Sequence, residues 1–417
     1  MWESLRVRNY RLFASGQVVS LTGTWMQRVA QDWLVVELAG PGHRGIAVGV
    51  TTGLQFAPTL LLSLYGGVLA DRHRKRRLLV LTQAASMLAA LVLGVLVVTG
   101  AVQLWHVYAL AFALGLATSI DSPTRQAFVS ELVGPDLVAN AVSLNSATFN
   151  IARILGTAAG GFLIKFVGTG AVFLINAGTF LAVISSLLLI READLMLGKR
   201  LARRAGQLRE GLAYVRRRPD LLLPIVLVGV VGTFGFNFQL TMALIAKGTF
   251  HKDAASYGLL STAIAVGSLG GALLAARRER PRQSLLVGSA LVFGALEIAD
   301  GFMPSYAALI ILLIPTGVAA LTFTTAANST VQLGSSPQMR GRVMALYVMV
   351  FLGGTPIGAP LIGWLAGVLG PRYGLIIGGA VCTAVAGAIA AMLLRLRMAQ
   401  QPTRSVQPVY DEVRTTT

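Results

Sequence analysis

The chain has 417 residues, of which 55% are hydrophobic and only 12% are charged, with a mean hydropathy of +0.70 and a formal net charge of +18. Soluble domains average about 25% charged residues, so this composition excludes an ordinary soluble globular protein. The sequence instead predicts a multi-pass membrane protein that contacts the lipid bilayer along most of its length.

Long apolar runs recur along the whole chain, and each is long enough to cross a hydrocarbon core of roughly 30 Å. They are expected to be helices, because lipid leaves every backbone polar group to be satisfied within its own segment. The fold class predicted is therefore an all-α protein with twelve transmembrane helices. We place them near residues 13–37, 46–69, 78–99, 104–121, 139–166, 171–190, 221–246, 255–276, 284–302, 306–327, 343–367 and 373–394.

The basic residues are distributed unevenly between the two sides of the membrane that these segments define. With the N-terminus on one side, 28 of the 35 Lys and Arg residues fall on that side and five on the other. This is the positive-inside pattern, which predicts that both termini are cytoplasmic in a cell (inner) membrane. The positive charge thus indicates topology, and we expect no nucleic-acid partner, because no basic surface interleaved with aromatic residues accompanies it.

The first segment, "SGQVVSLTGTWMQRVAQDWLVVEL", is the least lipid-like. Thr24, Gln27, Arg28 and Gln31 share one helical face, and Asp32 lies four residues after Arg28, so the two charges can pair. Ionisable residues at this depth are costly and should face protein or a water-filled cavity. Asp32 is our proton-coupling candidate with Arg28 as its partner; a static structural ion pair is the alternative.

The loop after the second segment reads "GGVLADRHRKRRLLV", a single aspartate followed by a cluster of bases. Gly67, Asp71, Arg72, Lys75 and Arg76 resemble the loop 2–3 signature of the major facilitator superfamily, with Arg74 in place of its second glycine. The stretches "DSPTRQAFVSELV", "NAVSLNSATFNIARILG" and "RGRVMALYVMVFLGGTPIG" resemble the bacterial exporters grouped with the enterobactin exporter, which include drug efflux proteins. The resemblance covers about residues 5 to 395.

This resemblance implies two six-helix bundles that alternately open to either side of the membrane. It also implies that the loop forms a cytoplasmic gate, in which Asp71 accepts hydrogen bonds from a helix start or pairs with an arginine when that side is shut. The alternative is that the bases serve topology alone, with Asp71 as local charge balance.

The fifth segment carries a further buried cation, Arg153, with no acid nearby in the sequence. It either meets a carboxylate on another helix or binds an anionic substrate. The same segment has Gly156 and Gly160 four residues apart, a spacing that allows helices to approach closely, and Gly354 with Gly358 repeats it in the second half. Thr157 replaces the proline of the superfamily's antiporter motif. Arg125 follows the fourth segment rather than lying within it, and both departures weaken the antiport reading.

The two halves of the chain resemble each other. Residues 139–168 align with 341–370 at a constant offset of 202, which matches Gly156, Gly161 and Gly168 to glycines of the second half. This predicts an N-terminal bundle over 1–190, a basic, amphipathic cytoplasmic linker over 191–220, a C-terminal bundle over 221–395, and a disordered tail over 396–417. Parallel repeats of this kind are typical of secondary transporters, whose site lies between the halves.

Further polar and aromatic residues could line the same central cavity, although packing between helices is the more ordinary role for each. Glu37, Glu297 and Asp300 lie near the outer ends of segments and are expected at wet mouths. The complete set of candidate cavity or substrate residues is Thr24, Gln27, Gln31, Asn145, Phe149, Asn150, Arg153, Phe234, Asn237, Phe238, Thr325 and Asn328.

No phosphate-binding loop occurs, the four histidines are scattered, and Cys382 is the only cysteine. We therefore expect no catalytic residues, no metal and no cofactor, and predict that the protein is not an enzyme. The sequence favours a monomeric secondary exporter of a small amphipathic molecule, driven by protons. An importer or uniporter of the same fold, and a membrane scaffold or sensor that transports nothing, remain the alternatives.

Overall fold

The computed structural model describes residues 3–196, 207–276 and 283–399; within these, the side chains of 63–68, 70, 71, 207, 208, 276 and 394–399 are not described. Parts of the expected linker and nearly all of the expected tail lie outside these residues. Every regular element within them is helical, as the sequence predicts. The elements are η1 (Glu3–Arg6), α1 (Arg8–Leu38), α2 (Arg44–Arg72), α3 (Lys75–Val98), α4 (Leu104–Val133), η2 (Pro135–Leu137), α5 (Val138–Leu189), η3 (Glu192–Asp194), α6 (Gln207–Arg216), α7 (Pro219–Val230), η4 (Val231–Gly235), α8 (Phe238–Gly248), α9 (Ala254–Ala276), α10 (Gln283–Phe302), α11 (Tyr306–Gly334), α12 (Arg340–Gly353), α13 (Thr355–Leu369) and α14 (Tyr373–Ala399).

Among the described residues, ten helical segments are long and apolar enough to cross a membrane, against the twelve that the sequence predicts. One of the ten, Pro135–Leu189, has 55 residues and contains Gly168 at φ 79°, where two helices meet at a sharp kink. A residue at this φ is favourable only without a Cβ, so glycine is required there. The 31-residue α1 is not among the ten, and it is the helix with the polar residues described above.

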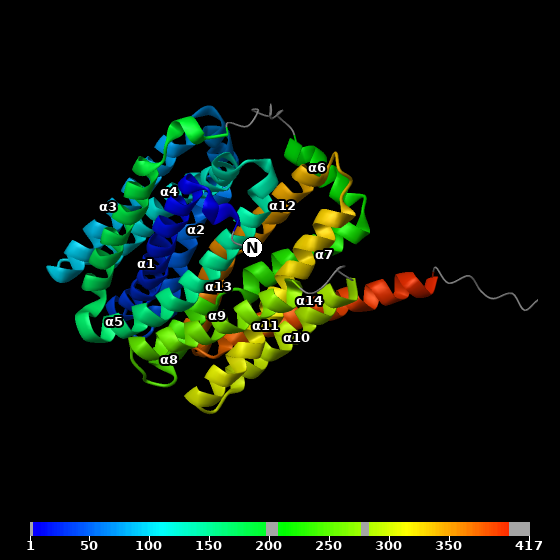
Figure 1. The fold of residues 1–417 in the computed structure, drawn as a ribbon. Helices are drawn as coiled ribbons and strands as arrows, with labels where there is room; N and C mark the ends of the chain where they lie inside the picture. Colours follow the sequence, from blue (N-terminus) through cyan, green and yellow to red (C-terminus); the bar gives the residue numbers. More distant parts are fainter. Residues whose placement is uncertain (1–2, 197–206, 277–282, 400–417) are drawn as a thin grey trace, which may run out of the picture.

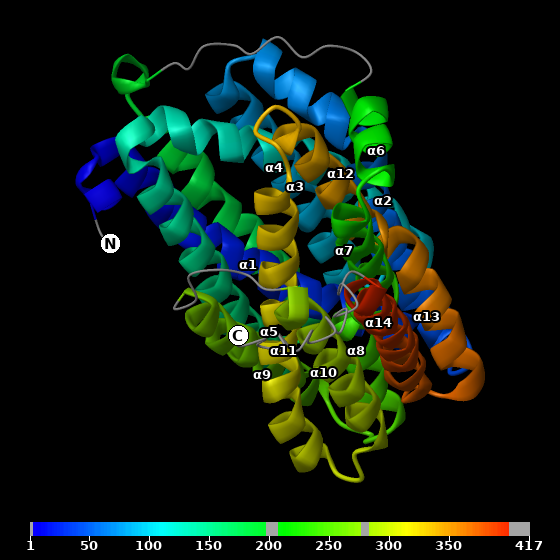
Figure 2. The same ribbon diagram turned by 90° about the vertical axis from the view of Figure 1, so that its right-hand side faces the viewer.

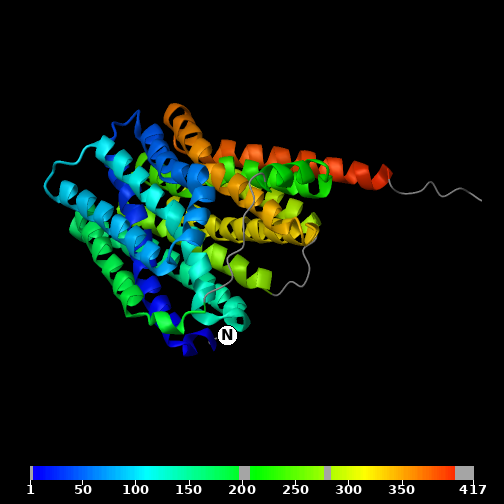
Figure 3. The ribbon, with the colours of Figure 1, turned by 90° about the horizontal axis from the view of Figure 1, so that it is seen from above.

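The helices form two groups that lie side by side. In Figure 1 the blue and cyan helices of the first half lie to the left and the yellow-to-red helices of the second half to the right, and Figure 3 shows the same separation from above. Within the first group α1 packs along α5 and α2 along α4; within the second, α9 packs along α11 and α10 along α14. Each group thus buries its own helix faces.

The molecule has two ends with different loops, a linker end and a far end. The linker end carries residues 73–74 and 191–196 together with α6, and Arg76 reaches Glu192 there at 2.8 Å. The far end carries residues 39–43, 99–103 and 249–253. Figure 2 shows α6 beside α12 at the linker end, and Arg342 of α12 pairs with Glu210 of α6 at 2.6 Å. Of the described linker residues, 191–196 therefore pack against the first half and α6 packs against the second.

The two halves meet through close helix contacts toward the far end. A Cβ added to Gly45 on α2 would lie 2.1 Å from the carbonyl oxygen of Gly363 on α13, and one added to Gly161 on α5 would lie 2.8 Å from Gly258 on α9. Helices can approach this closely only where both lack side chains. The side-chain hydrogen bonds and ion pairs between the halves, among the described residues, also lie in this part of the molecule. Asp32 contacts Tyr257, Thr157 contacts Thr262, and Lys165 contacts Asp253.

Candidate functional site

A cavity of about 330 Å³ lies within the first half, and its wall is unusually polar for a membrane protein. Along α1 it extends from Gln17 to Arg28, roughly 16 Å at the 1.5 Å rise of a helix. Polar side chains at this depth are costly unless they pair or face water, so their concentration marks a functional site. The remaining lining residues are Ser20, Leu21, Thr24, Trp25, Gln55, Gln83, Ser86, Leu114, Thr118, Asp121, Ser122, Arg125, Gln126, Asn145, Phe149 and Phe180.

Arg28 lies against aromatic rings in this cavity. Its guanidinium carbon is 4.8 Å from the centre of the Trp25 ring and 5.6 Å from that of Phe56, and its buried Nε has no hydrogen-bond partner. Arg153 approaches the same Trp25 ring at 6.0 Å, and its Nε is also buried without a partner. Cation–π contacts contribute roughly 0.5–2 kcal/mol each, less than the several kcal/mol that removing an ion from water costs.

Asp32 has a different partner from the one that the sequence suggests. Its Oδ2 accepts a hydrogen bond of 2.7 Å from the hydroxyl of Tyr257, on α9 of the other half, and Arg28 is not within ion-pair distance of it. Arg28 and Asp32 remain near enough to interact electrostatically, but they form no direct ion pair in this conformation, in which Arg28 lies against the rings of Trp25 and Phe56. Tyr257 is fully buried and its ring stacks on Trp33 at 6.4 Å. Sequence reasoning missed Tyr257, since nothing local relates residues 225 positions apart.

A second cluster that the sequence did not single out surrounds Asp121. The carboxylate pairs with Arg125 one turn along α4 and accepts hydrogen bonds from Thr82 at 2.8 Å and Gln83 at 2.7 Å. Arg125 also donates to Gln17 on α1. The expected end of the fourth segment at residue 121 was too early: α4 continues to Val133, so Arg125 lies within a helix and in the cavity wall.

The polar face predicted on α1 divides between three directions. Thr24 and Arg28 line the cavity, Gln27 accepts a hydrogen bond of 2.5 Å from Asn176, and Gln31 donates one of 3.2 Å to Gln55 on α2. A helical face wide enough to hold all four residues meets several neighbouring helices, so only part of it reaches the cavity.

On α5, Asn145 and Phe149 line the cavity, and the Phe149 ring meets that of Trp25 edge-on at 5.6 Å. Asn150 instead donates to the carbonyl of Ser146 and accepts a hydrogen bond of 3.2 Å from Arg153. The structure thus brings Arg153 close to Trp25 and Asn150, and no carboxylate of the described residues forms an ion pair with it.

The second half has its own open cavity, of about 580 Å³, with aromatic walls. Of the predicted residues, Phe238, Thr325 and Asn328 line it, together with Phe236, Ile264, Ser268, Ala320, Leu321, Thr324, Ser329, Tyr347, Val348 and Phe351. Phe234 lines a separate groove with Leu60 and Thr233. Asn237 is buried and donates to the backbone carbonyl of Thr233. It caps the π-turn of η4 rather than facing this cavity.

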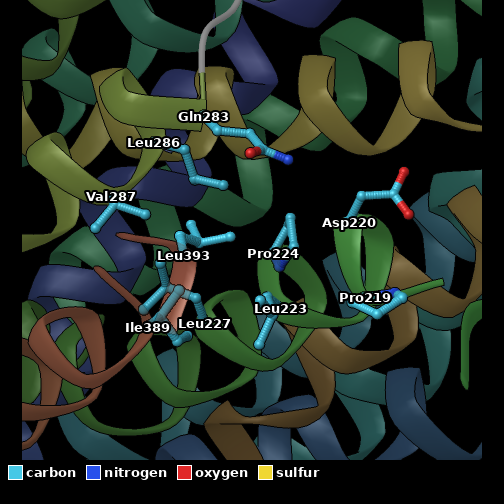
Figure 4. A pocket seen from close by; sticks show the side chains of 10 residues that line it. All are labelled: Pro219, Asp220, Leu223, Pro224, Leu227, Gln283, Leu286, Val287, Ile389 and Leu393. Carbon is cyan, nitrogen blue, oxygen red and sulfur yellow. The ribbon is translucent and has the colours of Figure 1, made fainter. Parts of the chain in front are cut away.

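Figure 4 shows a further, much smaller pocket at the start of α7, with Asp220 at its edge and Pro224, Leu227 and Leu393 around it. Its volume is about 10 Å³, which is room for one water molecule at most. It is too small for a substrate site.

The loop after α2 forms ion pairs at the linker end. Lys75 contacts Glu131 of α4 at 2.5 Å, and Arg76 contacts Glu192 at 2.8 Å while donating to the carbonyls of Leu187 and Leu188. Arg72 is exposed. The side chain of Asp71 and the surroundings of Gly67 lie outside the described residues, so the gate assigned to them stays a prediction.

Two carboxylates expected at a wet mouth are instead buried inside the second half. Glu297 is 1% and Asp300 2% exposed. Asp300 accepts a hydrogen bond of 2.8 Å from Thr316, while one oxygen of each carboxylate has no partner. The prediction of wet positions was wrong because position along the membrane normal does not say which face of a helix meets protein. Glu37 is exposed, as expected.

The glycines singled out in the sequence lie at close helix contacts. A Cβ on Gly156 would come within 2.5 Å of the Thr22 carbonyl oxygen, and one on Gly358 within 1.8 Å of the Thr233 carbonyl oxygen. Gly160 and Gly354 face Met26 and Thr233 in the same way. Among the described residues, no three His, Cys, Asp or Glu side chains gather as metal ligands.

Two groups of apolar helices around polar and aromatic cavities define a multi-pass membrane transporter. Its relatives specify the family. A family model described as transmembrane secretion effector matches residues 1–413, and the chain belongs to this family of major facilitator superfamily transporters. It is a transporter and not an enzyme.

Curated relatives point the same way. The chain is 25% identical over 386 residues to the multidrug efflux pump Tap of Mycolicibacterium fortuitum, covering 90% of this chain and 93% of that protein. It is 26% identical over 371 residues to the enterobactin exporter EntS of Citrobacter koseri, covering 86% of each. A match to the staphyloferrin A transporter of Staphylococcus aureus is 24% identical and spans 64% of that protein.

Solved structures share the fold. A bacterial homologue of the human lysosomal transporter Spinster, in an inward-facing and unoccupied conformation, superposes with a TM-score of 0.74 at 14% identity, covering 93% of this chain and 98% of that one. The nucleoside transporter NupG superposes with a TM-score of 0.72 at 12% identity, covering 93% of this chain and 99% of that one. At these identities the likeness concerns the fold alone.

Proposed function

We propose that the protein exports a small amphipathic molecule by alternating access in exchange for protons, with the linker end in the cytoplasm. The positive-inside pattern supports this orientation, since it assigns the loops of the linker end to the cytoplasmic side. In that orientation the contacts between the halves close the outer side, and the cavity near Arg125 and Gln126 belongs to a conformation open inward.

The observation that carries the proposal is the hydrogen bond from Tyr257 to Asp32. It joins the two halves at the depth where they close, directly beyond the cavity that contains Arg28. An ionised carboxylate accepts such a bond more strongly than a protonated one. Opening of the outer side breaks this bond and frees Asp32 for a proton from outside, and closure brings Tyr257 back into competition with that proton.

In this scheme a proton binds Asp32 from the outside, where the proton-motive force makes protons abundant, and leaves it after the outer side has closed. Substrate enters the inward-facing cavity and leaves when that cavity opens outward. The exporters among the relatives support the direction. An importer or uniporter of the same fold differs only in this coupling, whereas a scaffold or sensor would not require buried charges facing a cavity.

Everted membrane vesicles provide the test. Vesicles with the wild-type protein or Asp32→Asn are energised, and uptake is measured for a labelled aromatic carboxylate, a catechol, a macrolide and a lipophilic cation. We expect proton-driven accumulation of at least one compound, its collapse with a protonophore, and its loss in Asp32→Asn. Accumulation that survives the protonophore or the Asp32→Asn substitution would exclude proton exchange through Asp32. If none of the compounds were transported, the result would favour a scaffold or sensor that transports nothing.

A further inference from the structure

We propose that the cavity of the first half binds an anionic, ring-containing molecule, with Arg28 holding its negative group, Arg153 adding positive charge from behind the lining at Trp25, and Trp25 and Phe149 holding its apolar part. This inference names the substrate class for the proposed export. It rests on the proposed function for the movement of the molecule across the membrane, whereas the binding of the molecule does not depend on that function.

The first observation is the unused hydrogen-bonding capacity of two arginines. Arg28 donates no hydrogen bond to a described residue, and Arg153 donates one, to the neutral side chain of Asn150. Both guanidinium groups lie within 6.0 Å of the centre of the Trp25 ring. A guanidinium group has five N–H donors in a fixed planar arrangement that fits a carboxylate or phenolate.

The second observation is that the acidic side chains near the cavity already have partners. Asp121 is held by Arg125, Thr82 and Gln83, and Asp32 by Tyr257. Arg28, Arg125 and Arg153 thus lie in or near the cavity with two aspartates, which leaves one positive charge in excess. In a cavity with partly apolar walls, a positive excess attracts anions and repels cations.

The third observation is the aromatic surface next to these charges. Trp25 and Phe149 both line the cavity, meeting edge-on at 5.6 Å, and Phe149 is 42% exposed. An exposed ring in a cavity offers a face for a flat apolar group beside the arginines. The volume of about 330 Å³ falls within the range of small-molecule sites.

The charge also fits the direction of export. A cell interior is electrically negative, so an anion leaves along the membrane potential while a cation must be driven against it. A cavity selective for anions would therefore require less coupling energy per molecule exported.

The experiment measures binding to the purified full-length protein in detergent, without added lipid, by isothermal titration calorimetry. The probes are 1-naphthoate, its neutral isostere 1-naphthamide, a naphthylmethyl-trimethylammonium cation, and sulfate as an anion without a ring. We expect 1-naphthoate to bind at least about tenfold more tightly than any of the other three, since a hydrogen bond to a charged group contributes this much.

Arg28→Gln and Arg153→Gln should each weaken 1-naphthoate binding about tenfold, and Arg28→Lys, which keeps the charge and fits the fold most easily, should recover part of it. Arg6→Gln, which removes an exposed charge that does not line this cavity, serves as the matched control. Thermal unfolding of each variant checks that it is folded.

The proposal is overturned if 1-naphthoate does not bind, if the amide or the cation binds as tightly, or if both glutamine variants bind it as the wild type does. Sulfate binding as tight as that of 1-naphthoate would overturn the role of Trp25 and Phe149, because sulfate has no ring for them to hold. Because binding does not depend on transport, Arg28-dependent binding together with vesicles that show no proton-driven export would overturn the proposed function and leave this site standing.

Discussion

The hydroxyl of Tyr257 on α9 donates a hydrogen bond of 2.7 Å to Asp32 on α1, and both side chains are buried where the halves close. Tyr257→Phe removes the donor while keeping the ring that stacks on Trp33. Hydrogen bonds to charged groups contribute about 1.5–3 kcal/mol, so we expect a shift of several-fold or more toward the conformation open at the far end. Spin labels at Val167 and Lys252, on opposite halves, should show a longer distance in the variant. An unchanged distance distribution would mean that the bond does not hold the halves together.

Lys165 pairs with Asp253 across the two halves at 3.2 Å, in a partly exposed position at the far end. Partial burial opposes the ionisation of Asp253, but hydrogen bonds from Ser256 and the charge of Lys165 outweigh it and hold its pKa below the ordinary value. The bridge should therefore be complete above about pH 4 and be lost only as the pH falls through the lowered pKa.

Exposed ion pairs contribute about 0–1 kcal/mol, so Asp253→Asn should open the far end only slightly. The difference between the variant and the wild type should be smaller at high salt, because salt screens the pair. The same pair of spin labels measures this from pH 8 to pH 3. A large opening between pH 8 and pH 5 that Asp253→Asn abolished would contradict the assignment.

Gly45 meets the backbone of Gly363 so closely that a Cβ would lie 2.1 Å from its carbonyl oxygen. Gly45→Val should therefore leave each half folded but prevent closure of the far end, and transport should fall by at least about tenfold because one conformation of the cycle is lost. Gly40→Val is the matched control, since a Cβ at Gly40 meets nothing within 4 Å. Normal transport in Gly45→Val would show that α2 and α13 need not touch during the cycle.

Asp71 begins the basic loop after α2, and the gate assigned to it predicts that Asp71→Asn keeps the protein folded and inserted yet reduces transport. The amide keeps the shape but loses the charge that would hold a helix start or an arginine. The ion pairs of Lys75 with Glu131 and of Arg76 with Glu192 do not involve Asp71, so they should persist in the variant. Transport by Asp71→Asn at the wild-type rate, at equal amounts in the membrane, would leave the bases with a role in topology alone.

Glu297 and Asp300 lie three residues apart on α10, and neither forms an ion pair with a described basic residue. A buried carboxylate without a counter-charge is costly when ionised, so a neutral isostere should not destabilise the fold. We expect Glu297→Gln to leave the midpoint of thermal unfolding unchanged or raise it by a few degrees, and Glu297→Lys to lower it clearly. A marked loss of stability in Glu297→Gln would show that the charged form is required.

Several features of the site could be predicted from the sequence because their signal is local. A polar residue inside an apolar helix must face protein or water, which was enough to single out Thr24, Arg28 and Arg153. The same reasoning failed for Arg125, because the apolar run ends near residue 121 while the helix continues to Val133. Hydropathy reports where lipid ends, not where a helix ends.

The sequence by itself determined the membrane-spanning class, the repeat of the two halves, the family resemblance and the presence of Arg28, Asp32 and Arg153 inside apolar segments, since composition, periodicity and motifs are properties of neighbouring residues. The tertiary structure alone decided which side chains each buried charge contacts. It turned Arg28 toward Trp25 and Phe56, gave Asp32 to Tyr257 on the other half, and enclosed Glu297 and Asp300 in protein. The physical reason is that the rotation of each helix about its axis, and the neighbour it therefore meets, depend on packing between segments far apart in the chain.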